Sequence, residues 1–231
     1  LYGEMLERYQ AGRFDFPAEV IIVWTDDGDG RMRALPEQLG KWKHGVYYHL
    51  AYYGDTTKQT THTVAPGRIA AEFRKIVDSG ATEYVLVNVS ELRGFVMETR
   101  MIADITWDSP AAFGVADAPN RFIEWWCREY FGEGAAKDAA EVYRHYYQIL
   151  DGHDKLWHGS EKVQEILKLL VDRLAGRRFS PVSLELQRGL QQRRDAFRTV
   201  MNFVDRAERQ MTRPQQQFFY ENATLGLLLD Q

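Results

Sequence analysis

The sequence has a single cysteine and no long apolar run. Cys127 has no partner within the chain, which excludes a disulfide-bonded scaffold. A membrane-spanning helix needs about 18 or more consecutive apolar residues, and no such run occurs, so we expect no membrane partner. No basic segment followed by an apolar core opens the sequence, and no signal peptide is therefore visible.

Several motifs that bind cofactors or carry catalysis are also missing. The sequence contains no phosphate-binding P-loop, no dinucleotide-binding glycine fingerprint and no G-x-S-x-G nucleophile elbow. Its histidines lack metal-binding spacing. A calcium loop counted from Asp26 fails because Gly28 stands at its third position and supplies no ligand. The sequence therefore predicts no metal and no cofactor.

Apolar and aromatic residues are plentiful. Of the 231 residues, 45% are hydrophobic, and six Trp, twelve Tyr and twelve Phe supply enough apolar surface for a folded core, which excludes a disordered chain. The formal charge is −4, and this mild acidity argues against a nucleic-acid partner. The length allows one or two domains.

Two regions of different composition meet near residue 115. The first begins with a helix up to about Ala11, and the second is almost entirely helical. Consecutive β-branched and apolar residues in the first region predict strands buried on both faces, as in a parallel sheet. The expected strands cover residues 19–24, 45–50 and 83–89, with a helix at 66–78. The expected helices of the second region cover residues 119–131, 135–150, 160–175, 181–211 (with a break at Gly189 left open) and 213–229.

Strands that alternate with helices favour an α/β arrangement with right-handed crossovers, followed by an all-α part. Only three or four strands fit, whereas a complete eight-stranded barrel needs about 200 residues or more. We therefore expect residues 1–115 to be the C-terminal half of a (β/α)8-type barrel and residues 116–231 to be an antiparallel helical bundle. The sequence also begins as if inside a helix, which suggests a piece of a longer protein.

A polar cluster follows each expected strand: Asp26 and Asp27, then His49 and Tyr52, then Asn88 and Glu91. Ligands bind at this carboxyl-terminal edge in α/β sheets and barrels. The adjacent carboxylates can serve as acid and base or bind sugar hydroxyls, and the alternative is a simple turn.

Tyrosines surround His49 at positions 47, 48, 52 and 53. Aromatic faces combined with phenol and imidazole hydrogen bonds suit a sugar or another flat polar ligand, although a histidine at a strand end often has only a structural role. Asn88 can satisfy either the backbone or a ligand hydroxyl. The helix pattern alone gives Glu4 no role beyond an exposed position.

Residues 173–213 contain ten arginines and only four acidic residues. A solvated helix face explains this composition, and a surface for an anionic partner is the alternative. In the second case this stretch would make the region a helical partner-binding domain.

The order of several short motifs resembles glycoside hydrolase family 115. The motifs are Tyr2–Met5, a break from Gly12 to Pro17, Val20–Gly28, Arg33–Pro36, Gly45–Gly54, Asn88–Arg93, Thr106–Asp108 and Tyr130–Gly132. The similarity covers about residues 2–150. Members of this family are xylan α-1,2-glucuronidases, and the resemblance implies a barrel followed by helices.

The resemblance implies that an inverting hydrolase removes glucuronic acid, or its 4-O-methyl form, from a polysaccharide or oligosaccharide. Glu4 resembles the general acid, Asp26 resembles a second active-site carboxylate, and His49 and Tyr52 resemble contacts to the uronic acid. A further carboxylate and a uronate-binding arginine are expected upstream of Glu4. The full set of expected site residues comprises Glu4 and Asp26 as catalytic residues, and Asp27, Tyr48, His49, Tyr52 and Asn88 as substrate-binding residues.

The polysaccharide substrate implies a secreted or periplasmic protein, and a homodimer is left open.

Several positions depart from the family pattern. Gly28 replaces an asparagine, and Ser90 and Glu91 replace a Gly-Asp pair. These departures leave an alternative hypothesis, a divergent non-catalytic module that binds carbohydrate or another partner.

Overall fold

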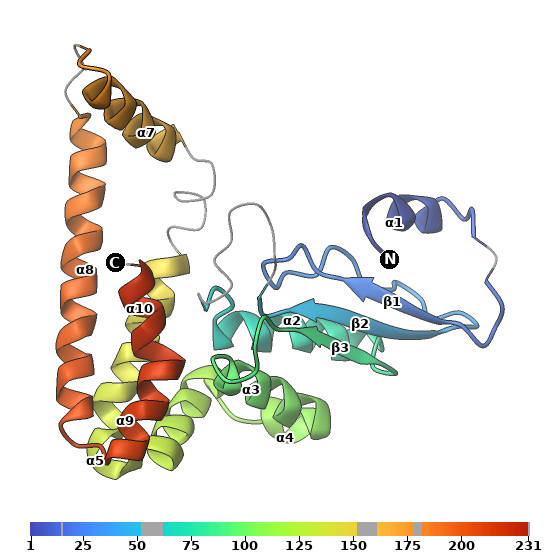
Figure 1. Cartoon of the computed structure of the whole chain (residues 1–231). Helices are drawn as coiled ribbons and strands as arrows, with labels where there is room; N and C mark the ends of the chain where they lie inside the picture. The colour runs from blue at the N-terminus through green and yellow to red at the C-terminus, as the bar shows by residue number, and fades with distance from the viewer. Residues whose placement is uncertain (15, 52–61, 152–160, 178–181, 231) are drawn as a thin grey trace. The chain divides into compact units, whose positions relative to one another are not determined.

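The computed structural model describes residues 1–14, 16–51, 62–151, 161–177 and 182–230. Contacts between Cα atoms divide the chain into two compact units. The first covers Leu1–Tyr52 and Val64–Phe122 and contains the sheet, and the second contains the helices from Ile123 onward (Figure 1). This boundary lies a short distance beyond the change in composition near residue 115. Among the described residues, no helix combines the length and apolarity needed to cross a bilayer.

The first unit contains a three-stranded parallel sheet in the order β1-β2-β3. The strands are β1 (Ile21–Thr25), β2 (Lys43–His49) and β3 (Val85–Asn88). Helix α2 (Pro66–Ser79) connects β2 to β3 and ends at Gly80, whose φ of 76° is a left-handed conformation that favours glycine. Residues 26–42, which connect β1 to β2, form no helix. The sheet and the helices that follow confirm the expected mixed α/β class with a mostly helical second part.

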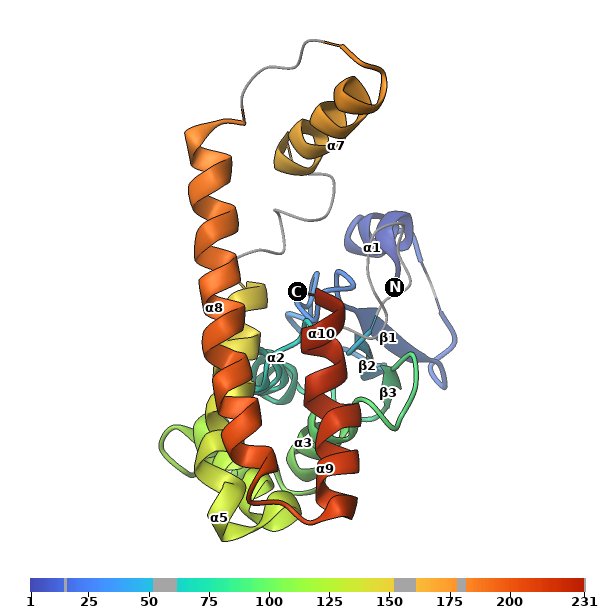
Figure 2. The same cartoon turned by 60° about the vertical axis from the view of Figure 1, so that its left-hand side comes forward.

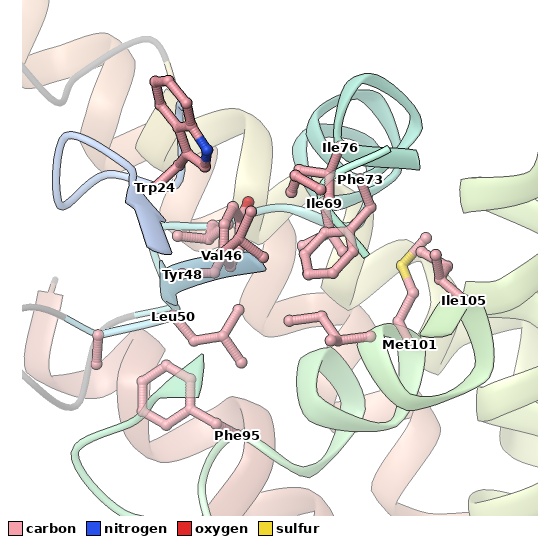
Figure 3. Close-up of a cluster of buried hydrophobic side chains, with 14 of the residues drawn as sticks. Trp24, Val46, Tyr48, Leu50, Ile69, Phe73, Ile76, Phe95, Met101 and Ile105 are labelled. Atoms are coloured by element: carbon pink, nitrogen blue, oxygen red, sulfur yellow. The ribbon is translucent and has the colours of Figure 1, made fainter. Parts of the chain in front are cut away.

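One face of this sheet packs on helices. Val46, Tyr48 and Leu50 are fully buried against α2 and α3 (Val96–Trp107), with Phe73 and Met101 among their neighbours (Figure 3). The apolar positions of α2 fall on one side of the helix, as its sequence spacing predicts. Helix α4 (Ser109–Phe113) follows at once, and Arg74 of α2 lies over the ring of Phe113.

The opposite face of the sheet is far more open. Side chains of alternate residues point to opposite faces, so Ile21 of β1 and Leu86 of β3 turn away from α2. Ile21 is 39% exposed and Leu86 is 44% exposed. This face of the parallel sheet is therefore partly uncovered by the described residues.

The second unit is built from long helices with an aromatic core. Helix α5 (Ala118–Asp151) is interrupted at Gly132, whose φ of 82° and ψ of 160° are not helical. The remaining elements are α7 (Glu161–Leu174), α8 (Leu184–Glu208), α9 (Arg213–Phe219), the π-helix η1 (Tyr220–Thr224) and α10 (Leu225–Asp230). Trp126 stacks on Tyr130 with ring centroids 3.8 Å apart, and Phe131 meets Phe219 of α9 edge to face. Figure 2 shows α9 and α10 following one another as an almost continuous helix near the C-terminus.

Helix α8 is continuous through Gly189, so the break left open by the sequence does not occur. Its buried residues include Phe197 and Val200, and its Arg206 forms an ion pair with Asp138 of α5. Helix α7 differs, because several of its apolar residues are exposed. Leu167 is 54% exposed and Leu174 is 87% exposed.

The single thiol offers a direct test of the second unit. Cys127 is fully buried in α5, and burial raises the pKa of its thiol. Reactive thiolate is therefore scarce at pH 8, and we expect iodoacetamide to modify the native chain at least about tenfold more slowly than the unfolded chain. Mass spectrometry before and after denaturation measures both rates without interference, because no other cysteine is present. Equal rates would contradict the buried position.

Candidate active site

The carboxyl-terminal ends of the three parallel strands bring three of the expected site residues together. Asp26 directly follows β1, His49 is the last residue of β2, and Asn88 is the last residue of β3. His49 and Asn88 are direct partners in the β2–β3 register. The backbone N–H groups of Leu50 and Ala51 both donate to the Asn88 carbonyl oxygen and continue this pairing beyond the strands.

The Asp26 carboxylate is buried and accepts three hydrogen bonds. Its Oδ1 atom accepts from the Gly28 backbone N–H at 3.1 Å and from Nδ1 of His49 at 2.5 Å. Its Oδ2 atom accepts from the His49 backbone N–H at 2.8 Å. The side chain of Asp26 is 0% exposed and that of His49 is 1% exposed. Asp26 therefore joins the ends of β1 and β2 through a charge-assisted contact in a dry environment.

Asp27 lies in a different environment although it is the next residue. It is exposed, and its Oδ1 atom accepts from the backbone N–H groups of Asp29 and Arg31, at 2.8 Å and 3.1 Å. These contacts are those of an aspartate that stabilises a turn. Gly28, with a φ of 95°, occupies a left-handed conformation that side chains rarely adopt.

Tyr48 does not reach this edge, because it points to the helix-covered face of the sheet. It is fully buried, packs edge to face on Phe73, and donates its hydroxyl hydrogen to the Gly30 carbonyl oxygen at 2.9 Å. Burial, and then the negative charges of Asp26 and Glu72, raise the pKa of the Tyr48 hydroxyl. Its observed contacts hold the loop after β1 against the core.

Tyr47, which is not among the expected site residues, lies beside His49. Its ring centroid lies 4.4 Å from that of His49, and its hydroxyl oxygen accepts a hydrogen bond from Nδ2 of Asn88 at 2.9 Å. Tyr47 and Asn88 are only partly buried, unlike Asp26 and His49. The alternation of side chains along β2 is the signal that could have identified Tyr47, since positions 47 and 49 share a face.

Glu4 lies in the first turn of α1 (Gly3–Gln10) and is exposed. The start of this helix is attached to the same edge of the sheet. The Leu1 backbone nitrogen donates to the Val23 carbonyl oxygen, and the Thr25 hydroxyl donates to the Leu1 carbonyl oxygen at 3.1 Å. The ring of Tyr2 meets that of Tyr47 edge to face at 6.3 Å. These contacts anchor the segment that carries Glu4 near the ends of β1 and β2.

Tyr52 lies outside the described residues. Within the described part of the chain, no group of three or more His, Cys, Asp or Glu side chains is arranged to hold a metal ion. The edge offers imidazole, phenol, amide and carboxylate groups beside partly exposed aromatic surface. That combination suits a ligand rich in hydroxyl groups.

Comparison with known proteins gives a family and a fold. The family model for glycosyl hydrolase family 115 matches residues 1–154. Among solved structures, the chain is similar to "a novel family GH115 4-O-Methyl-alpha-glucuronidase, BtGH115A, with specificity for decorated arabinogalactans", at 20% sequence identity and a TM-score of 0.77. The similarity covers 98% of this chain and 29% of that one. Among curated proteins, none matches in sequence.

Proposed function

Because the chain belongs to glycosyl hydrolase family 115, whose model matches residues 1–154, we propose that it is part of an inverting α-glucuronidase. The substrate is α-1,2-linked glucuronic acid, or its 4-O-methyl form, on a xylan-type polysaccharide. The observation that carries the proposal is the meeting of Asp26, His49, Tyr47 and Asn88 at one edge of a parallel sheet. Since the polysaccharide lies outside the cell, the protein is secreted or periplasmic.

Inversion requires a protonated carboxyl group that donates to the leaving oxygen and a carboxylate that activates water on the opposite side of the sugar. Glu4 is the proposed acid, since its helix begins at the edge that carries His49 and Tyr47. Sugar hydroxyls and ring faces are bound by Tyr47 and Asn88, with His49, Asp27 and Tyr52 beside them. The remaining catalytic carboxylate comes from a part of the protein beyond this chain.

The open face of the sheet supports a place within a larger barrel. In a (β/α)8 barrel, helices cover the outer face of a parallel sheet, and side chains from all eight strands fill the interior. Here α2 and α3 cover one face, whereas Ile21 and Leu86 are exposed on the other. We propose that this second face is the barrel interior, that residues 1–115 complete the barrel, and that residues 116–231 form the helical domain that follows.

The test is an assay of the full-length protein on glucuronoxylan, followed by proton NMR from the first seconds of the reaction. Inversion of an α-linkage releases the β-anomer of the uronic acid first, with the α-anomer appearing by mutarotation. Initial release of the α-anomer would contradict the inverting mechanism. Release of uronic acid from arabinogalactan but not from xylan would support the uronidase activity and show that the substrate is a different polysaccharide.

A second candidate, a carbohydrate-binding module without catalysis, is supported by the departures at Gly28, Ser90 and Glu91. Gly28 supplies only its backbone N–H to the site, where it donates to Asp26. Calorimetry separates the two candidates. Binding of glucuronoxylan oligosaccharides by the full-length protein with no release of uronic acid would favour the module.

A further inference from the structure

We propose that Asp26 acts in this site as a positioning residue and not as a carboxylate that touches the sugar or activates water. Its carboxylate fixes the backbone and the imidazole of His49, with a ring proton on Nδ1. Through His49 it fixes Tyr47 and the β2–β3 edge that receives the ligand. The identity of that ligand rests on the proposed function, whereas the hydrogen-bond arrangement does not.

Burial is the first argument. A group that activates water must lie within hydrogen-bond reach of a solvent-derived or substrate atom. The Asp26 side chain is 0% exposed, and His49, which is itself buried, is its direct partner. The partly exposed residues at the edge are Tyr47 and Asn88. The site is therefore layered, with Asp26 deepest, His49 above it, and Tyr47 and Asn88 towards the ligand.

The number of donors around Asp26 is the second argument. Two backbone N–H groups and the His49 ring all point at the carboxylate, and each of its two oxygens accepts at least one of these bonds. Only a group that accepts hydrogen bonds on both oxygens satisfies all three donors. An asparagine would turn its NH2 group either towards the His49 backbone N–H or towards the Gly28 N–H, and either orientation places two donors against each other.

The contacts of His49 provide the third argument, because they link Asp26 to the ligand-facing groups. The His49 ring lies against Tyr47, whose hydroxyl accepts from Asn88, and Asn88 is the strand partner of His49. A shift of the His49 ring therefore moves the Tyr47 ring and the Asn88 amide together. A displacement of about 1 Å, even when its cause lies far from the reacting atoms, can lower the rate by about 100-fold.

The first experiment measures the ring proton directly in the full-length protein with 15N-labelled histidine. We expect His49 to carry a proton on Nδ1, and Asp26→Asn to shift the His49 ring nitrogen signals. Asp27→Asn is the matched control, since both of its backbone bonds use one oxygen that an asparagine retains. An unprotonated Nδ1 in the wild-type chain would overturn the proposal, and so would unchanged His49 signals in Asp26→Asn. The wild-type spectrum alone shows whether Nδ1 of His49 carries a proton, so the proposal is tested even if the variant does not fold.

The second experiment uses the full-length protein. Asp26→Asn is expected to lower kcat for uronic acid release by about 100-fold. Asp78→Asn is the control for activity, because Asp78 is exposed in the last turn of α2, and we expect it to stay within about twofold of wild type. Azide replaces the missing base in glycosidases that have lost one, so we expect no rescue of Asp26→Ala by azide. Rescue, with a β-glycosyl azide as product, would assign Asp26 as the base and overturn the proposal. A wild-type protein without activity would contradict the proposed function, while the NMR result would still decide the role of Asp26.

Discussion

Replacing Glu4 by glutamine in the full-length protein is expected to lower kcat for uronic acid release by about 1000-fold, with KM nearly unchanged. Glutamine has the size of glutamate and can hydrogen-bond to the glycosidic oxygen, but it cannot transfer a proton to the departing sugar. A substrate with a better leaving group depends less on protonation by a general acid. The loss should therefore be much smaller on a 4-nitrophenyl α-glucuronide than on glucuronoxylan, and kinetics on both substrates measure the difference.

Glu7→Gln is the matched control for this prediction. Glu7 is exposed on the same helix, one turn beyond Glu4, so its replacement removes the same charge from α1. We expect Glu7→Gln to retain activity within about twofold. Full activity in Glu4→Gln, or an equal loss in both variants, would show that Glu4 is not the acid.

Gly45→Ala is expected to destabilise the sheet by about 3 kcal/mol. A Cβ atom at position 45 would lie 2.4 Å from the Tyr84 carbonyl oxygen and 2.6 Å from the Tyr84 Cβ atom. The nearest atom belongs to the backbone, so no change of rotamer relieves the clash. The same carbonyl accepts a hydrogen bond from the Val46 N–H at 2.7 Å, and separating the strands would break it. Urea unfolding followed by circular dichroism measures the loss.

Gly67→Ala provides the control for the steric argument. A Cβ atom at position 67, in the first turn of α2, would meet no other atom within 4 Å. Alanine favours helix over glycine, so we expect this variant to be unchanged or stabilised by up to about 1 kcal/mol. If both alanine variants were equally stable, the close approach of β2 to Tyr84 would not be present in the protein.

The apolar runs in the sequence were sufficient to locate all three strands to within a few residues, because buried parallel strands need consecutive apolar side chains. They did not predict α3, although Met97, Met101 and Ile105 recur every four residues on its buried side. The expected alternation of strands and helices also fails between β1 and β2. There the chain is held instead by loop contacts, such as the bond from the Met32 N–H to the buried Glu72 carboxylate.

The sequence by itself determined the class of fold, the polar residues that end each strand, and the family to which the motifs belong. These features depend on local composition and order. Only the tertiary structure decided that Asp26 is buried while Asp27 is exposed, and that Tyr47 joins His49 while Tyr48 enters the core. Alternation along a strand shows which residues share a face, but the packing of distant helices decides which face is covered. The pairing of Asp26 with His49 likewise depends on strand register, which residues far apart in the chain set together.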